Sequence, residues 1–62
     1  MLYNVGEYHQ MKSDHGKFLK RNTWVRIVER RKLRKDTVVT VEDENGVLYR
    51  GVSVKKLRKK AR

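Results

Sequence analysis

The chain has 62 residues, with 17 Lys and Arg against 7 Asp and Glu, a formal net charge of +10, and neither cysteine nor proline. A chain of this size needs nearly every apolar side chain for its own core, which excludes a deep substrate cavity. We therefore expect no enzymatic activity, no cofactor and no small-molecule substrate. Without cysteine, no disulfide or thiolate metal site can form, and a reducing compartment is favoured. Residues 1–62 are predicted to form a single domain.

The charge excess indicates a polyanionic partner, because charge of one sign destabilises a compact chain through self-repulsion. Nucleic acid, either DNA or RNA, is the first candidate. An anionic membrane surface and an acidic protein surface are the alternatives. No apolar run approaches the ~18 residues of a membrane span, and the N-terminus lacks the basic start and apolar run of a signal peptide. We expect a cytoplasmic or nucleoid-associated protein without membrane contact.

Residues 1–16 are predicted to be an irregular strand followed by a loop. In a strand, alternate residues would share one face: Tyr3, Val5, Glu7, His9 and Met11. A short helix is the competing interpretation of residues 1–12, because Val5, Tyr8 and Met11 also fit helical spacing. Gly6 weakens both interpretations. Ser13–Gly16 has the composition of a turn.

Lys17–Asn22 is expected to be a loop that holds Phe18 and Leu19 against the core. Thr23–Arg30 is predicted to be a strand, because it is rich in β-branched residues and lacks Gly and Pro. A helix is the competitor, since its spacing would also fit Trp24, Ile27, Val28 and Arg31. As a strand, one face carries Val25, Ile27 and Glu29. The other face carries Trp24, Arg26, Val28 and Arg30.

Arg31–Asp36, R-K-L-R-K-D, is predicted to be the charged tip of a hairpin, with Leu33 folded back onto the edge of the core. Thr37–Val54 has the clearest pattern, because two runs rich in Val, Thr and Tyr flank Asn45-Gly46. This dipeptide predicts a β-hairpin with a two-residue type I′ loop. That register pairs Glu42 with Tyr49, Val41 with Arg50 and Val39 with Val52. Alternation then places five apolar residues on one face: Val39, Val41, Leu48, Val52 and Val54.

A three-residue loop with a bulge is the alternative for this hairpin, and it would shift the pairing by one residue. Gly51 is interpreted as a bulge that turns Arg50 outward. After the hairpin, Val54 and Leu57 are expected to close a short helical turn or strand against the core. Residues 58–62 are expected to be a basic, frayed tail.

This pattern predicts a mainly β fold, a small antiparallel barrel of four to five short strands with a core over residues 17–57. The order is a strand, a long loop, a strand, a basic hairpin, a strand, the Asn-Gly hairpin, a strand and a short closing turn. From Lys17 to Lys59 this order resembles the SH3-like barrels of Tudor and KOW-type modules. The resemblance implies a fold and a tendency to bind nucleic acid or protein tails. The glycine-rich KOW signature is absent, and no site residue is transferred. A helix packed on a three-stranded sheet is the second candidate.

The two basic clusters, Arg30–Lys35 and Lys55–Arg62, flank the central hairpin in the sequence. We interpret them as a surface that neutralises phosphates and releases counterions. A solvated charge run that only confers solubility is the alternative. The predicted nucleic-acid-binding residues are Arg26, Arg30, Arg31, Lys32, Arg34, Lys35, Arg50, Lys55, Lys56, Arg58, Lys59 and Lys60.

Two aromatic residues are candidates for base stacking. Trp24 shares a predicted strand face with Arg26 and Arg30, as in single-strand binders, although a lone tryptophan usually packs in the core. Tyr49 could stack on a base or pack across from Glu42. Two further groups are expected to have ordinary roles. Glu42–Glu44 is expected to be a soluble acidic turn. His9, Asp14 and His15 are expected to be surface residues with no metal or catalytic function.

The sequence therefore predicts a non-enzymatic protein that binds nucleic acid through phosphates with low sequence specificity and a steep salt dependence. The alternative is a protein-interaction module of an accessory or viral type. Such a module would dock its basic face or a sheet edge on an acidic partner such as a polymerase. A component of a larger ribonucleoprotein is a third possibility.

Overall fold

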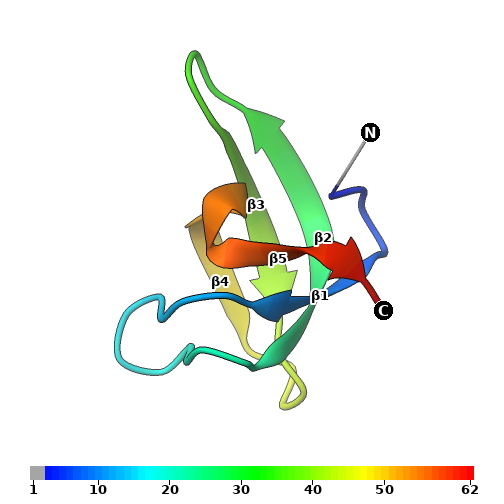
Figure 1. The fold of residues 1–62 in the computed structure, drawn as a ribbon, viewed down its shortest axis with the longest axis vertical. Helices are drawn as coiled ribbons and strands as arrows, with labels where there is room; N and C mark the ends of the chain where they lie inside the picture. The colour runs from blue at the N-terminus through cyan, green and yellow to red at the C-terminus, as the bar shows by residue number, and fades with distance from the viewer. Residues whose placement is uncertain (1–2) are drawn as a thin grey trace.

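Five short antiparallel strands make one sheet in the computed structural model, which describes residues 3–62 (Figure 1). The elements, in chain order, are β1 (Tyr8–Met11), β2 (Trp24–Lys32), β3 (Thr37–Glu42), β4 (Leu48–Ser53), the 3₁₀ helix η1 (Val54–Lys56) and β5 (Leu57–Ala61). The spatial order is β4-β3-β2-β1-β5. Within residues 3–62, no helix is long and apolar enough to cross a membrane. Met1 and Leu2, part of the expected N-terminal strand, lie outside the described residues.

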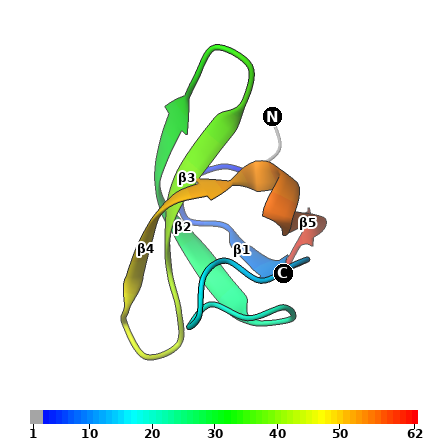
Figure 2. The same cartoon turned by 90° about the vertical axis from the view of Figure 1, so that its left-hand side faces the viewer.

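The predicted mainly β fold is confirmed, but the sheet is open and the expected closed barrel is not formed. In the described chain β4 and β5 are the two edges of the sheet. The nine-residue β2 joins its halves, since its first residues pair with β1 and the rest with β3. The short η1 turn then carries the chain across the sheet, so that β5 pairs with β1 (Figures 1 and 2). The sheet therefore curls over its apolar side without closing.

Every strand contributes to one small core. The buried apolar side chains are Met11, Leu19, Val25, Ile27, Val39, Val41, Val52 and Leu57. They follow the period of two that a strand with one buried face requires, which confirms the predicted inward positions of β2 and β3. The N-terminal segment adds Met11 and the buried His9, so the core extends beyond residues 17–57.

The β3–β4 loop shows why the two-residue prediction was wrong and its alternative correct. Glu42 pairs with Leu48 and Val41 with Tyr49, one residue away from the predicted register. The Asp43 carboxylate accepts the N–H groups of Asn45 and Val47 at 2.9 and 3.0 Å and closes the loop locally. The Val47 N–H, the Tyr49 hydroxyl and the Asn45 N–H hold the pKa of Asp43 below its ordinary value.

The bulge at Gly51 restores the predicted pairing of Val39 with Val52. Gly51 has φ +68°, a conformation that favours glycine, and Arg50 is exposed beside it. The shift at the loop reverses two side chains relative to the prediction. Leu48 is exposed, whereas Tyr49 packs against the core.

A second bulge, at Val28 of β2, corrects the predicted faces of that strand. Ile27 pairs with Val41, but Glu29 pairs with Thr40, so one residue of β2 has no opposite partner. Arg30 pairs with Val39 and therefore shares the core side of the sheet. The predicted single face of Trp24, Arg26, Val28 and Arg30 is wrong for this reason.

Three expectations about chain segments outside the central hairpin are also corrected. Phe18 is 82% exposed, whereas Leu19 is fully buried, because a tight turn brings the His15 N–H to 2.7 Å from the Leu19 carbonyl oxygen and leaves Phe18 outside. Leu33 is exposed at the hairpin tip, which extends beyond the core (Figure 1). Arg58–Ala61 belong to β5 and are not a frayed tail.

Phe18 and Leu19 form a matched pair for testing this packing. Leu19→Ala removes a fully buried side chain and is expected to lower the free energy of unfolding by about 2–5 kcal/mol. Phe18→Ala removes a larger side chain from the surface and is expected to change it by less than about 0.5 kcal/mol. Urea unfolding followed by Trp24 fluorescence measures both. A larger loss for Phe18→Ala would contradict the placement of this loop.

Candidate anion-binding groove

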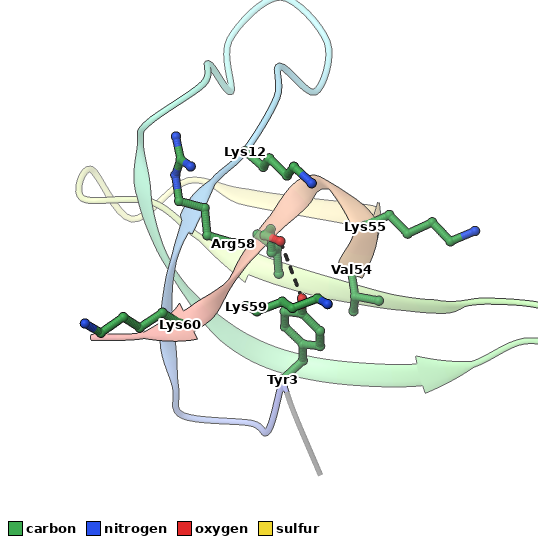
Figure 3. Close-up of a pocket in the computed structure, with 8 residues that line it drawn as sticks. Tyr3, Lys12, Val54, Lys55, Arg58, Lys59 and Lys60 are labelled. Carbon is green, nitrogen blue, oxygen red and sulfur yellow. Dashed lines mark hydrogen bonds between the residues drawn. The ribbon is translucent and has the colours of Figure 1, made fainter.

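A groove of about 580 Å³ lies along η1 and β5 (Figure 3). Its walls come from the N-terminal segment, the residue after β1, η1 and most of β5, and are formed by Tyr3, Lys12, Val54, Lys55, Leu57, Arg58, Lys59 and Lys60. Five of these eight residues are cationic and none is acidic. The groove therefore offers a concentrated positive charge above an apolar floor.

Backbone hydrogen bonds fix the strand on which most of these cations lie. The Lys12 N–H donates to the Lys56 carbonyl at 2.6 Å, and the Arg62 N–H donates to the Tyr8 carbonyl at 2.8 Å. Between them, Met11 pairs with Leu57, and both side chains are buried. The basic segment is thus part of the sheet and anchored in the core.

His9 adds a side-chain bond to this attachment. Its ring is 1% exposed, and Nδ1 lies 2.8 Å from the Arg58 carbonyl oxygen. Because a carbonyl oxygen only accepts, Nδ1 holds the proton in this bond. Nε2 lies 3.1 Å from Oε1 of Glu7. His9 therefore has a structural role and links β5 to the turn before β1.

The side chains of the groove are held apart along its length. Figure 3 shows Lys55 and Lys60 directed toward its two ends, with Lys12 and Lys59 between them. The Arg58 guanidinium donates to Oδ1 of Asn22 at 2.9 Å, which holds it over the neighbouring loop. The Ser53 hydroxyl accepts the Lys55 N–H at 3.3 Å at the start of η1.

The carboxylates of the chain do not neutralise the groove. Contacts between carboxylates and basic side chains within residues 3–62 include Glu7 with His9, Asp14 with Lys20 and Glu42 with Arg26. None of them uses a cation of the groove. Mutual repulsion between these like charges favours binding of an anion.

The other predicted binding residues lie on different parts of the surface. Arg31 and Arg50 line a separate hollow of about 320 Å³ that also contains Glu29. Nζ of Lys56 lies 3.3 Å from Nδ1 of His15, and Arg30 is half-buried on the core side. Three more cations are exposed at the end of the β2–β3 hairpin: Lys32, Arg34 and Lys35.

Trp24 is half-buried and is not part of the core cluster, so the core alternative for this residue is not met. The Arg62 guanidinium stands 5.7 Å from the centre of its ring, at a distance typical of a cation–π contact. Arg26, the expected neighbour in a stacking platform, is bonded to Glu42 at 3.1 Å. Asp43 and Glu44 line the same hollow. These carboxylates disfavour a phosphate at this position.

Tyr49 packs against the core, and its hydroxyl donates to Oδ2 of Asp43 at 3.0 Å. Burial and the Asp43 carboxylate raise the pKa of this hydroxyl. The packing alternative is therefore supported for Tyr49, although its strand partner is Val41 and not Glu42.

Two residues of the groove, Tyr3 and Lys12, were not predicted from the sequence. Lys12 is isolated among uncharged neighbours in the chain, and its place beside Lys55–Lys60 depends on the pairing of β1 with β5. Tyr3 reaches the groove from the turn before β1, where its hydroxyl donates to the Leu57 carbonyl at 3.5 Å. No local sequence pattern indicates either contact.

No group of three or more His, Asp or Glu residues suited to holding a metal ion occurs within residues 3–62. The comparisons with protein-family models, with curated proteins and with solved structures find no match for this chain. The function is therefore inferred from the charge and shape of the groove.

The His9–Glu7 link predicts an acid-dependent loss of stability. The Asn4 N–H, at 2.7 Å, and then His9 hold the pKa of Glu7 below its ordinary value of 4.5. Because the pKa of Glu7 is lower in the folded state, ionised Glu7 stabilises the fold at any pH above its ordinary pKa. This stabilisation is lost as the pH falls through the lowered, folded-state pKa. Glu7→Gln should therefore be less stable than the wild type at pH 7, and the difference should shrink as the pH falls from about 5 to 3.

Thermal unfolding of both proteins across this pH range measures the effect. Glu44→Gln, at an exposed position of the β3–β4 loop, is the matched control and should show no such convergence. A difference between Glu7→Gln and wild type that is constant with pH would contradict the prediction.

Proposed function

We propose that this protein binds nucleic acid through phosphate contacts, with low sequence specificity and without catalysing a reaction. The groove of η1 and β5 supports the proposal most strongly, because five cations surround it and no carboxylate lines it. Lys and Arg side chains that contact phosphates displace the counterions condensed on the nucleic acid, and this release favours binding. The lack of cysteine is consistent with action in the cytoplasm.

The β2–β3 hairpin provides a second set of contacts in this proposal. The hairpin extends above η1 in Figure 2, and Lys32, Arg34 and Lys35 near its tip are exposed. The longest dimension of the molecule is 29 Å, so the hairpin and the groove can contact one short stretch of nucleic acid.

The acidic residues provide an orientation for the bound strand. Glu42, Asp43 and Glu44 cluster at the β3–β4 loop, at the opposite end of the long axis from the β2–β3 hairpin (Figure 1). Carboxylates repel phosphates at that end. We infer that the nucleic acid follows the groove toward the β2–β3 hairpin and avoids the β3–β4 loop.

A protein partner is the second candidate, and one surface feature favours it. Phe18 and Val47 are 82% and 48% exposed and line a hollow of about 460 Å³ with Asp43 and Tyr49. Exposed apolar side chains of this kind often mark protein contacts. An acidic protein would engage the basic face of the chain and these apolar side chains together.

Charge reversal in the groove tests the proposed function. Lys55→Glu/Lys59→Glu should weaken binding to nucleic acid at low salt by about tenfold or more, because both lysines line the groove. Lys17→Glu/Arg21→Glu makes the same change in net charge at exposed loop positions and should weaken binding to nucleic acid much less. Filter binding with single-stranded DNA, duplex DNA and RNA measures the effect.

The salt dependence of the same titration provides a second readout. Five contacts predict a log–log slope of roughly −3 to −4 on a single strand, and two fewer contacts make it shallower by roughly 1.4. Equal losses for the two double variants would show that net charge alone matters. No binding above the micromolar range at low salt would favour the protein partner.

A further inference from the structure

The apolar floor of the groove is not explained by phosphate contacts. Tyr3, Val54 and Leu57 line it between the cations. A surface that only attracts phosphates needs no apolar side chains, and the Lys and Arg side chains alone would serve. The volume of about 580 Å³ also falls within the range of about 300–1,000 Å³ that is typical of sites for small organic groups.

Tyr3 is held in place as part of this floor. Its ring lies 4.9 Å from the His9 ring, at an interplanar angle of 41°, and its hydroxyl is bonded to the Leu57 carbonyl. Its backbone has φ +65°, a left-handed conformation that is unfavourable for a residue with a side chain. The backbone adopts this conformation where the Tyr3 side chain contacts His9 and Leu57, beside the groove.

We propose that the groove receives an unpaired base, so that the preferred ligand is single-stranded nucleic acid; this inference rests on the proposed function. A duplex presents phosphates outward and keeps its bases stacked inside, which leaves the apolar floor without a partner. A single strand places a base on the floor while Lys12 and Lys59 contact the adjacent phosphates. Aromatic side chains beside a cationic groove bind bases in this way, largely independently of sequence.

Two other hollows lined by aromatic side chains are less suited to this role. The Trp24 ring is approached by the Arg62 guanidinium, and three carboxylates line its hollow. The hollow of Phe18 contains Asp43 and no cation. A base bound at either place would bring its phosphates close to carboxylates. The groove is the surface where a base and its phosphates both find complementary groups.

An abasic oligonucleotide separates the base from the phosphate. We compare a short fluorescent thymidine oligomer with an abasic oligomer of equal phosphate number and with a duplex, by fluorescence anisotropy at one fixed salt concentration. The thymidine oligomer should bind roughly 5- to 150-fold more tightly than the abasic oligomer, the ratio expected for one stacked base. It should also bind more tightly than the duplex.

Three variants place the base in the groove. Tyr3→Ala and Val54→Gln should each reduce the preference for thymidine over abasic oligomer, while the affinity for the abasic oligomer stays close to that of the wild type. Tyr3→Phe keeps the ring and should keep the preference. Circular dichroism shows whether each variant folds. If Tyr3→Ala does not fold, Val54→Gln still tests whether the base binds in the groove.

Each result supports or overturns the inference. Equal affinity for the thymidine and abasic oligomers would overturn it and leave the phosphate-binding function intact. A preference for thymidine that survives in folded Tyr3→Ala and Val54→Gln would show that the base binds elsewhere. Absence of binding to all three ligands would overturn the proposed function itself, and this inference with it.

Discussion

The pairing of β1 with β5 determines where the positive charge of this chain lies. Without it, the last residues would be a basic tail with no fixed position. With it, Leu57 is buried beside Met11, and the His9 side chain bonds the Arg58 backbone at 2.8 Å. The lysines that follow are then held on a strand whose backbone cannot move away from the core. The groove is a consequence of this attachment.

The concentration of charge has an energetic consequence for folding as well as for binding. The cations of the groove repel one another, and no carboxylate of the described chain pairs with them. A polyanion that binds only the folded state relieves this repulsion and stabilises the fold, and the stabilisation grows with the logarithm of ligand concentration above the dissociation constant. An open sheet of 62 residues has a small core, so folding and ligand binding are expected to be closely linked.

The sequence predicted those features that depend on local patterns. Alternation correctly identified Val25 and Ile27 as inward residues, because a half-buried strand imposes a period of two. It failed at Arg30, where a bulge in β2 reverses the alternation. The predicted register of β3 with β4 near their loop was wrong because the Asp43 side chain, and not the Asn45-Gly46 dipeptide alone, determines the loop geometry.

Local sequence patterns could not predict the long-range contacts of the fold. Which of two adjacent apolar residues enters the core, as with Phe18 and Leu19, depends on how a loop meets the rest of the fold. Lys12 lies beside the cations of β5 because β1 pairs with β5, and these two strands are near opposite ends of the sequence. Four cations of the predicted C-terminal cluster line the groove together, but the apolar floor beneath them required the folded structure.

The most direct measurement is an NMR titration of ¹⁵N-labelled protein with a short single-stranded oligonucleotide. The account predicts that the largest amide shift changes cluster at Lys12 and at residues 54–60, with smaller changes in the β2–β3 hairpin. Changes centred on Trp24 and the acidic loop, or on Phe18 and Val47, would contradict it. So would a spectrum that does not change at low salt.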